Sequence, residues 1–315
     1  MAITNNVNSQ TLLVENFNYA SGSALTANGW TAHSGAGNNP VLISSSGLIF
    51  SGYPSSNIGL AASLNNDGED VNKVFKQILT GNVYCAFMFK AGSVTSDYFL
   101  HLSNSGISSN RARVYIKGTG SSFNFGLSKG AETETYTTGS VYSTGTTYLL
   151  VLKYTVVEGV SNDVVSLYIF NGSIPATEPS TSSIGPIGDA SQSDLSNVSA
   201  VALRQYSASQ NILIDGIRVS KKWEDAISVT TSDERLLINK LPSLYPNPSG
   251  NYLTVGNLSD TELIEILDLS GKVRLRINTC SSGKEILDLS SLISGIYFVR
   301  FSSSTGVKTM KLIKL

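Results

Sequence analysis

Short apolar stretches alternate with polar positions through the first two thirds of the chain, with almost no 3.6-residue periodicity. Loops rich in Gly, Ser, Asn and Thr separate these stretches, which predicts strands joined by turns. The predicted strands are residues 11–17, 41–50, 74–78, 83–90, 98–103, 111–117, 123–127, 147–157, 164–170, 198–205 and 212–221. So many strands in one unit predict two large antiparallel sheets packed face to face.

The same kind of pattern returns near the C-terminus on a smaller scale. Apolar runs occur at residues 252–255, 263–269, 272–277, 285–289, 296–301 and 307–313. Turn residues separate them at intervals of ~8–12 residues, which predicts a small, immunoglobulin-like β-sandwich. The chain of 315 residues is long enough for about two domains. We therefore expect a disordered N-terminus at 1–10, a large β domain at 11–226, a linker at 227–243 and a small domain at 244–315.

Three motifs follow one another in the small domain. They are a Pro-x-Pro entrance, a Gly-x-Tyr strand and a lysine-bearing last strand, formed by Pro246, Pro248, Gly295, Tyr297, Lys308, Lys311 and Lys314. Proline cannot donate a ladder hydrogen bond, so the first motif belongs at the entrance or edge of a strand. The lysines by themselves fit a charged edge strand that resists strand-to-strand aggregation.

In this order, at the end of the chain, the motifs resemble the C-terminal sorting domain of cargo exported by the type IX secretion system of Bacteroidetes. The resemblance implies that the translocon recognises the folded domain and that a sortase-like peptidase removes it. It also implies a secreted or surface-attached protein that first reaches the periplasm with a signal peptide. Residues 1–5 have neither a basic nor an apolar region, so we expect that the natural signal peptide is missing from this sequence.

The large domain also carries a resemblance. Its opening stretch at 13–17 and closing stretch at 212–219 are predicted partners, as in a jelly roll. Together with residues 28–35, 68–71 and 200–204, they resemble the laminin-G-like or concanavalin-like jelly rolls found beside sorting domains. That group is defined by fold and context rather than by one reaction, so the resemblance implies an extracellular module without a named ligand.

Composition and charge narrow the function classes. Charged residues are 14% of the chain and the formal net charge is −1, which offers no broad electrostatic reason to bind nucleic acid or an anionic membrane. No apolar run approaches the ~18 residues of a membrane span. Two cysteines, Cys85 in an apolar run and Cys280 in a turn, predict no disulfide framework.

Sequence signals for catalysis are weak. Residues 126–130 match Gly-x-Ser-x-Gly, but a helix should follow that motif and none is predicted. Glu132 and Glu134 alternate as a carboxylate pair could, yet they lie among threonines, which favours a solvated strand face. The histidines, His33 and His101, are far apart in sequence, so a zinc site is not expected.

Calcium is the ion that the sequence favours. Glu15 and Asp215 lie on the predicted first and last strands of the large domain, between which jelly-roll modules often hold calcium with hard oxygen ligands. Residues 65–70 form a second oxygen-rich loop. Surface acids that cap turns are the alternative for both sets. Aromatic residues in or beside loops could stack on sugars; they are Trp30, Tyr53, Tyr136 and Tyr142.

The leading hypothesis is a non-catalytic, exported protein whose jelly roll binds an extracellular glycan or another ligand. Calcium is its expected structural cofactor, and the type IX translocon, the sortase-like peptidase and a glycan are its expected partners. The alternatives are a secreted polysaccharide hydrolase of concanavalin-like fold and a surface adhesin or matrix protein.

Overall fold

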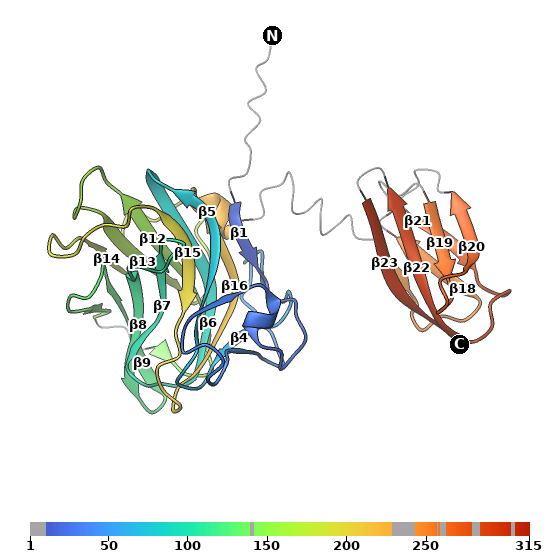
Figure 1. The fold of residues 1–315 in the computed structure, drawn as a ribbon, viewed down its shortest axis with the longest axis horizontal. Helices are drawn as coiled ribbons and strands as arrows, with labels where there is room; N and C mark the ends of the chain where they lie inside the picture. Colours follow the sequence, from blue (N-terminus) through green and yellow to red (C-terminus); the bar gives the residue numbers. More distant parts are fainter. Residues whose placement is uncertain are drawn as a thin grey trace, which may run out of the picture. The chain divides into compact units, whose positions relative to one another are not determined.

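The computed structural model describes residues 11–138, 142–228, 243–256, 258, 263–278, 284–303 and 306–315 (Figure 1). The chain divides into two compact units, one ending at Ser228 and the other beginning at Val229. Each is described by itself. The predicted disordered N-terminus, most of the predicted linker and Cys280 lie outside the described residues, so those expectations stay predictions.

The N-terminal unit contains two eight-stranded sheets whose strands all pair antiparallel. The first sheet has the order β14-β13-β12-β6-β16-β4-β3, with β1 also paired to β16. Its strands are β1 (Thr11–Glu15), β3 (Leu42–Ile43), β4 (Ala62–Leu64), β6 (Gly81–Ser93), β12 (Thr147–Val156), β13 (Val164–Phe170), β14 (Ile184–Ile187) and β16 (Asn211–Ser220). The predicted pairing of the opening and closing strands is confirmed, because Glu15 of β1 lies opposite Ile217 of β16.

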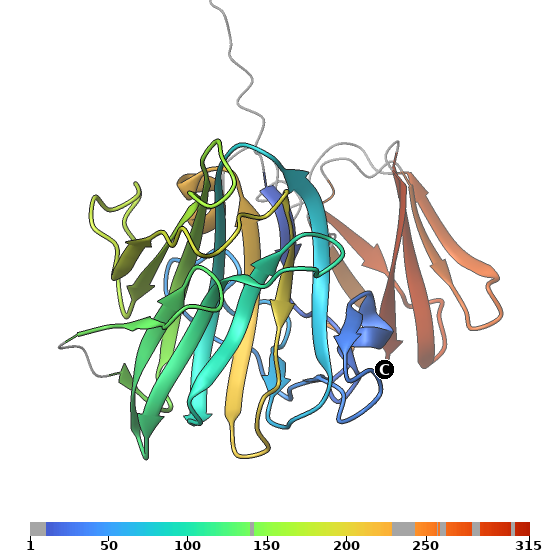
Figure 2. The same ribbon diagram turned by 60° about the vertical axis from the view of Figure 1, so that its left-hand side comes forward.

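The second sheet has the order β10-β9-β8-β7-β15-β5-β2, with β11 also paired to β9. Its strands are β2 (Thr31–Ser34), β5 (Asp70–Ile78), β7 (Asp97–Ser103), β8 (Arg111–Thr119), β9 (Ser122–Ser128), β10 (Thr135–Tyr136), β11 (Tyr142–Ser143) and β15 (Val198–Leu203). The short helix η1 (Leu25–Asn28) precedes β2. Figure 2 shows the two sheets as stacked layers. The unit is therefore the predicted large antiparallel jelly-roll sandwich.

The main hydrophobic core lies between the sheets. In β8, Ala112, Val114 and Ile116 face this core, because side chains in a strand alternate between its two faces. In β12, Leu150 and Leu152 do the same. The second core, on the outer face of the first sheet, includes Leu149 and Val151 of β12, which explains why this strand reads as a continuous apolar run.

The segment that covers the first sheet differs from the sequence prediction. Residues 41–50 were predicted as one strand, but only Leu42–Ile43 is a strand. Leu48 and Phe50 instead lie in a loop and are buried in the second core. Helix α1 (Trp223–Ile227) packs there too, so Ile227, at the predicted start of the linker, is buried in the jelly roll.

The C-terminal unit is a small sandwich of a three-stranded and a four-stranded sheet. The first contains β17 (Ser243–Tyr245), β18 (Tyr252–Gly256) and β21 (Lys284–Asp288); the second contains β19 (Leu263–Leu267), β20 (Val273–Asn278), β22 (Gly295–Ser303) and β23 (Gly306–Lys314). Alternate residues such as Leu253, Ile266 and Val299 form its core. The all-β prediction therefore holds for both units.

Candidate functional site

The outer face of the second sheet carries aromatic and cationic side chains. Since Ala112, Val114 and Ile116 point into the core, the alternate residues of β8 point outward. Neighbouring strands add further side chains to this face. We call it the open face and define it by Tyr98, His101, Arg113, Tyr115, Lys117, Tyr136 and Arg204. No hydrophobic cluster of the described residues covers it.

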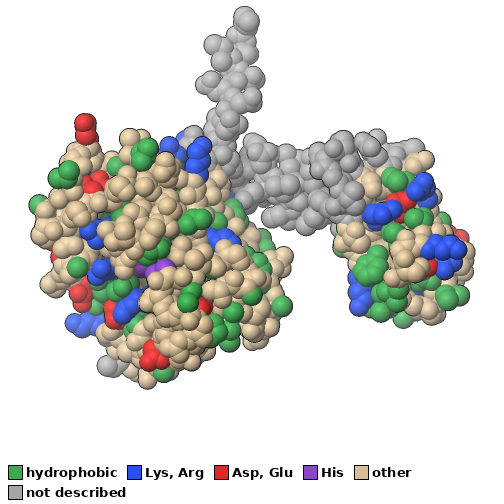
Figure 3. All heavy atoms as spheres, viewed as in Figure 1, with side chains coloured by type: hydrophobic (Ala, Val, Ile, Leu, Met, Phe, Trp, Pro, Cys, Tyr) green, Lys and Arg blue, Asp and Glu red, His purple; other side chains and the backbone are tan. Residues whose placement is uncertain are grey.

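Tyr98 is the centre of the open face. The guanidinium of Arg204 lies 4.2 Å from the centre of its ring, and that of Arg113 lies 5.0 Å away. The ring of Tyr115 packs edge-on at 5.5 Å. Cations over an aromatic face are attracted by the ring quadrupole, so these side chains hold one another in place before any ligand arrives. Figure 3 shows this side of the unit, with histidine and Lys/Arg side chains near its middle.

The two arginines differ in their electrostatic partners. Arg204 forms an ion pair with Asp97 at 3.0 Å and donates a hydrogen bond to the carbonyl oxygen of Tyr98. Arg113 has no carboxylate partner among the described residues, and its buried Nε hydrogen has no acceptor there. The positive charge of Arg113 is therefore not compensated within the described chain.

The histidines contribute little charge to the open face. Burial lowers the pKa of His101 to about 3, and burial also lowers that of His33. Their rings meet edge to face at 6.0 Å. Both side chains are expected to be neutral near pH 7, so the positive charge on this face comes from its arginines and Lys117. Lys117 itself lies over the ring of Tyr136.

A second cluster of interest surrounds Asp215. The strand β16 is irregular after this residue, and Gly216 has the positive φ of 58° that favours glycine. The Asp215 side chain is completely buried; Oδ2 accepts the N–H of Leu48 at 2.7 Å, whereas Oδ1 has no hydrogen-bond partner. Burial raises the pKa of Asp215 to about 7, and nearby Glu15 contributes.

The segments that contain Asn16 and Ser55 lie close by: a Cβ atom on Gly216 would lie 2.7 Å from the Cβ of Ser55, and one on Gly59 would meet the carbonyl oxygen of Asn16. Asn16 Oδ1 and Ser55 Oγ are buried without a hydrogen-bond partner in the described chain. A Cβ atom on Gly47 would lie 3.2 Å from Asp215 Oδ2 and 2.7 Å from the carbonyl oxygen of Gly59, so these two oxygens line one narrow gap. Buried polar atoms normally have partners. Carboxylate, amide, hydroxyl and carbonyl oxygens are of the hard ligand type that Ca²⁺ takes.

Glu15, the other predicted calcium ligand, accepts hydrogen bonds from the first loop with both of its carboxylate oxygens. Oε1 accepts the N–H of Phe17, and Oε2 accepts hydrogen bonds from Tyr19 and Trp30. Lys73 lies 3.6 Å from Oε2. The oxygen atoms of Glu15 thus already hold the first loop against the core. Its assignment as a calcium ligand stays a prediction, and the described residues include no group of three or more His, Cys, Asp or Glu that could hold a metal.

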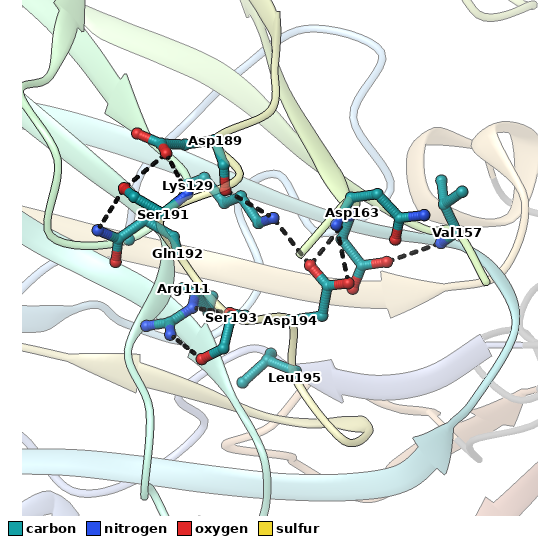
Figure 4. A network of polar contacts seen from close by, with 12 residues as sticks. Arg111, Lys129, Val157, Asp163, Asp189, Ser191, Gln192, Ser193, Asp194 and Leu195 are labelled. Carbon is teal, nitrogen blue, oxygen red and sulfur yellow. Dashed lines mark hydrogen bonds and ion pairs between the residues drawn. The ribbon is translucent and has the colours of Figure 1, made fainter. Parts of the chain in front are cut away.

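The Gly-x-Ser-x-Gly segment takes part in a network of hydrogen bonds and one ion pair. Ser128 donates to the carbonyl oxygen of Gly130, and the completely buried Lys129 forms an ion pair with Asp194 at 2.8 Å (Figure 4). Asp194 also accepts the N–H of Asp163. The network joins β9 to the loop before β15 and to the start of β13. A buried, fully paired lysine of this kind positions loops rather than activating a nucleophile.

Glu132 and Glu134, which the sequence predicted to lie on a solvated strand face, both accept hydrogen bonds from nearby groups. Glu132 accepts the N–H groups of Lys129 and Gly130, which makes it a cap for that turn. Glu134 accepts the hydroxyl hydrogen of Tyr136 at 3.0 Å. In the loop at 65–70, Glu69 accepts the N–H of Gly37.

Of the four aromatic residues proposed from sequence, only Tyr136 lies on the open face. Trp30 and Tyr53 are buried, and Tyr142 packs against the core. Sequence reasoning missed Tyr98, Tyr115 and both arginines. The alternating polar positions of residues 111–117 were the one signal that could have identified two of them.

The C-terminal motifs meet in space. Asn247, between the two prolines, donates its amide to the carbonyl oxygen of Lys311 and accepts the N–H of Ile313. Its side chain thus supplies the polar contacts that Pro246 and Pro248 cannot. Gly295, the first residue of β22, lies opposite Lys314.

The remaining motif residues are placed as follows. Tyr297 is buried and donates its hydroxyl hydrogen to the carbonyl oxygen of Ile293 at 2.9 Å. Lys314 is also buried, whereas Lys311 is exposed; the side chain of Lys308 lies outside the described residues. The three motifs therefore support one packing arrangement around the last two strands.

Residues 243–315 match the family described as the secretion system C-terminal sorting domain. This unit is a type IX secretion sorting domain. The sorting domain indicates export to the cell surface or secretion, and it implies an interaction with the type IX secretion machinery. None of the helices in the described part of the chain is long and apolar enough to cross a membrane.

The other comparisons concern the chain as a whole. No curated protein sequence matches it. Similar solved structures include the globular domain of T. cruzi calreticulin, at 12% identity and a TM-score of 0.43, which covers 68% of this chain and 89% of that one. The metal-free carbohydrate recognition domain of Emp46p is similar at 10% identity and a TM-score of 0.36, covering 68% and 97%. A carbohydrate esterase of bacteriophage phi24B is similar at 12% and 0.34, covering 69% and 100%.

Proposed function

We propose that the jelly roll preceding the sorting domain is a non-catalytic module that binds an extracellular glycan on its open face. The observation that carries this proposal is the preassembled cluster of Tyr98 with the guanidinium groups of Arg113 and Arg204. Aromatic side chains offer an apolar surface for the C–H groups of a sugar ring, and fixed donors beside them can read its oxygens.

The absence of catalysis is part of the proposal. A retaining glycosidase needs two carboxyl groups ~5–5.5 Å apart, one of them free to attack. Near the open face, the carboxylate of Asp97 pairs with Arg204, and that of Glu134 accepts the hydroxyl hydrogen of Tyr136. Engaged acids of this kind support binding rather than hydrolysis.

We also propose that Asp215 is the anionic ligand of a structural calcium ion. Asn16, Ser55 and the carbonyl oxygen of Gly59 would complete its oxygen set. Such an ion would neutralise the buried carboxylate and hold the loop at 44–59 against β16. Glu15 is not included, since its oxygens already accept three hydrogen bonds.

We propose two further partners, both of which would act on the sorting domain. A translocon component would recognise the sorting domain, and a sortase-like peptidase would remove it at the cell surface. The alignment of residues 246–249 with the last strand supports recognition of the folded domain rather than of a linear tail.

A binding screen of the full chain against neutral and acidic polysaccharides tests the glycan proposal. Tyr98→Ala should weaken any binding roughly tenfold. The matched control is Tyr168→Ala, which removes a tyrosine from the covered side of the other sheet. Binding that Tyr98→Ala leaves unchanged, or hydrolysis of a bound polysaccharide, would contradict the proposal.

Melting of the full chain with calcium and with a chelator tests the cation proposal. Calcium should raise the melting temperature of the wild type but not that of Asp215→Asn, because the variant lacks the anionic ligand. Glu15→Gln is the informative comparison and should retain the calcium response. An equal response of the wild type and Asp215→Asn would overturn the assignment.

A further inference from the structure

The open face has a charge imbalance that a neutral sugar would not use. It carries three cations, Arg113, Lys117 and Arg204, against two carboxylates: Asp97 pairs with Arg204, and Glu134 accepts the hydroxyl hydrogen of Tyr136. The histidines there have lowered pKa values, so they add little positive charge near pH 7. The imbalance is local, since the formal net charge of the whole chain is −1.

Arg113 is the least satisfied of these cations. Its guanidinium lies against Tyr98, and its Nε hydrogen is buried without an acceptor in the described chain. Burying part of a cation without an acceptor costs free energy, and such a group needs an explanation. A planar guanidinium is also the side chain best suited to a two-oxygen acceptor, whether carboxylate or sulfate.

We propose that the glycan bound by the open face is acidic, and that Arg113 receives its carboxylate or sulfate group while Tyr98 and Tyr136 pack against the sugar rings. This inference rests on the proposed glycan binding and names its ligand class. An acidic polysaccharide is favoured over a folded protein partner because the surface joins exposed or half-exposed cations to a few tyrosine rings. No apolar cluster of the described residues lies there.

Lys117 of β8 lies over Tyr136 of β10, and the strands β9 and β8 separate Tyr136 from Tyr98 of β7. A cation–aromatic pair on each side of the face suits a chain with repeated charges rather than a single acidic sugar. Arg204, neutralised by Asp97, positions the Tyr98 ring in this arrangement. Its removal is therefore expected to disturb neutral and acidic ligands alike.

Matched polysaccharide pairs test the inference on the full chain. Dextran sulfate against dextran isolates the sulfate group, and polygalacturonate against its methyl ester isolates the carboxylate. At least one acidic member should bind at least tenfold more tightly than its neutral partner. This preference should shrink as salt is raised, since exposed charges are screened.

Variants of Arg113 then test whether this side chain causes the preference for the acidic polysaccharide. Arg113→Met should weaken binding of the acidic polysaccharide on the order of tenfold to a hundredfold. It should weaken binding of the neutral one much less, because only the acidic polymer loses an ion pair. Lys222→Met, an exposed cation beside α1, should change nothing. Arg113→Lys keeps the positive charge but lacks the planar guanidinium, so it should weaken binding of the acidic polysaccharide by an intermediate factor. If Arg113→Met fails to fold, the result for Arg113→Lys tests the inference.

The outcomes separate this inference from the proposed function. Preference for only the sulfated or only the carboxylated member supports it and identifies the anion. Equal binding of neutral and acidic members, or an acidic preference that both Arg113 variants retain, would overturn the inference while leaving glycan binding intact. Failure to bind any polysaccharide would overturn both.

Discussion

The two sheets of the jelly roll share one core, but their outer faces have opposite characters. In β6 of the first sheet, Cys85 and Phe87 face the shared core, whereas Tyr84 and Met88 face a second core. In β8 of the second sheet, the residues that alternate with Val114 and Ile116 are Arg113, Tyr115 and Lys117. A second hydrophobic core thus covers one outer face, whereas no hydrophobic cluster of the described residues covers the other.

The covering of the first sheet is made by segments that a minimal sandwich does not need. Phe50 comes from the loop at 44–59, and Trp223 comes from α1. Trp223 packs against Tyr84 and Tyr168, and its Nε1 donates to the carbonyl oxygen of Pro175. Where a sheet face is left without such a cover and is furnished with polar and aromatic groups, a ligand is the simplest partner.

The largest expected effect is on the covered face. Trp223→Ala should lower the free energy of unfolding by about 3–5 kcal/mol, because it leaves a large cavity in the second core. Urea unfolding measures this loss. Glycan binding by the folded fraction should be unchanged; a parallel loss of binding in folded protein would show that the two faces are not independent.

A similar but smaller loss of unfolding free energy is expected when the ion pair between Lys129 and Asp194 is removed. Lys129→Met should cost about 3 kcal/mol, because it leaves Asp194 buried without its cation. Denaturant unfolding again measures the loss. The double variant Lys129→Met, Asp194→Asn should recover part of it, whereas equal losses in the single and double variants would contradict an ion-pair role.

On the open face, the same kind of truncation should change function instead of stability. Tyr98→Ala should alter the free energy of unfolding by less than about 1 kcal/mol, because its ring is partly exposed. Tyr168→Ala, on the covered face, should lose stability and keep binding. Measuring the free energy of unfolding and glycan binding for both variants tests this difference between the two faces. Equal changes in the two variants would contradict it.

The smallest expected effect concerns the border of the open face. Burial raises the pKa of Asp70 to about 6 from its ordinary value near 4, although its carboxylate accepts the N–H of Gln205. Between these pH values the unfolded chain releases the proton before the folded chain does. Stability should therefore fall as pH rises through this window.

Thermal melting at several pH values measures that trend. Asp70→Asn has no proton to lose at this position, so the difference in melting temperature between wild type and variant should change between about pH 4 and pH 6. A constant difference across the window would show that Asp70 titrates normally in the folded protein.

Local patterns in the sequence determined the strand content, the two-unit organisation of the chain and the sorting domain. Alternation exposes a strand directly, and the sorting motifs lie in order at the end of the chain. Asp215 could also be selected, because it stands out in the apolar last strand of the jelly roll. These features depend on residues close together in sequence, so no knowledge of the sheet order was required.

Only the tertiary structure decided what surrounds those residues. Asn16, Ser55 and Asp215 come from three distant segments, which lie side by side through the pairing of β1 with β16 and the contacts of Gly216 with Ser55 and of Gly59 with Asn16. Tyr98, Arg113 and Arg204 meet because β8, β7 and β15 are neighbours in one sheet. Whether a strand face is covered depends on loops such as 44–59, which carry no periodic signal. For this physical reason the sequence was sufficient to predict a jelly roll, whereas the open face could be identified only from the tertiary structure.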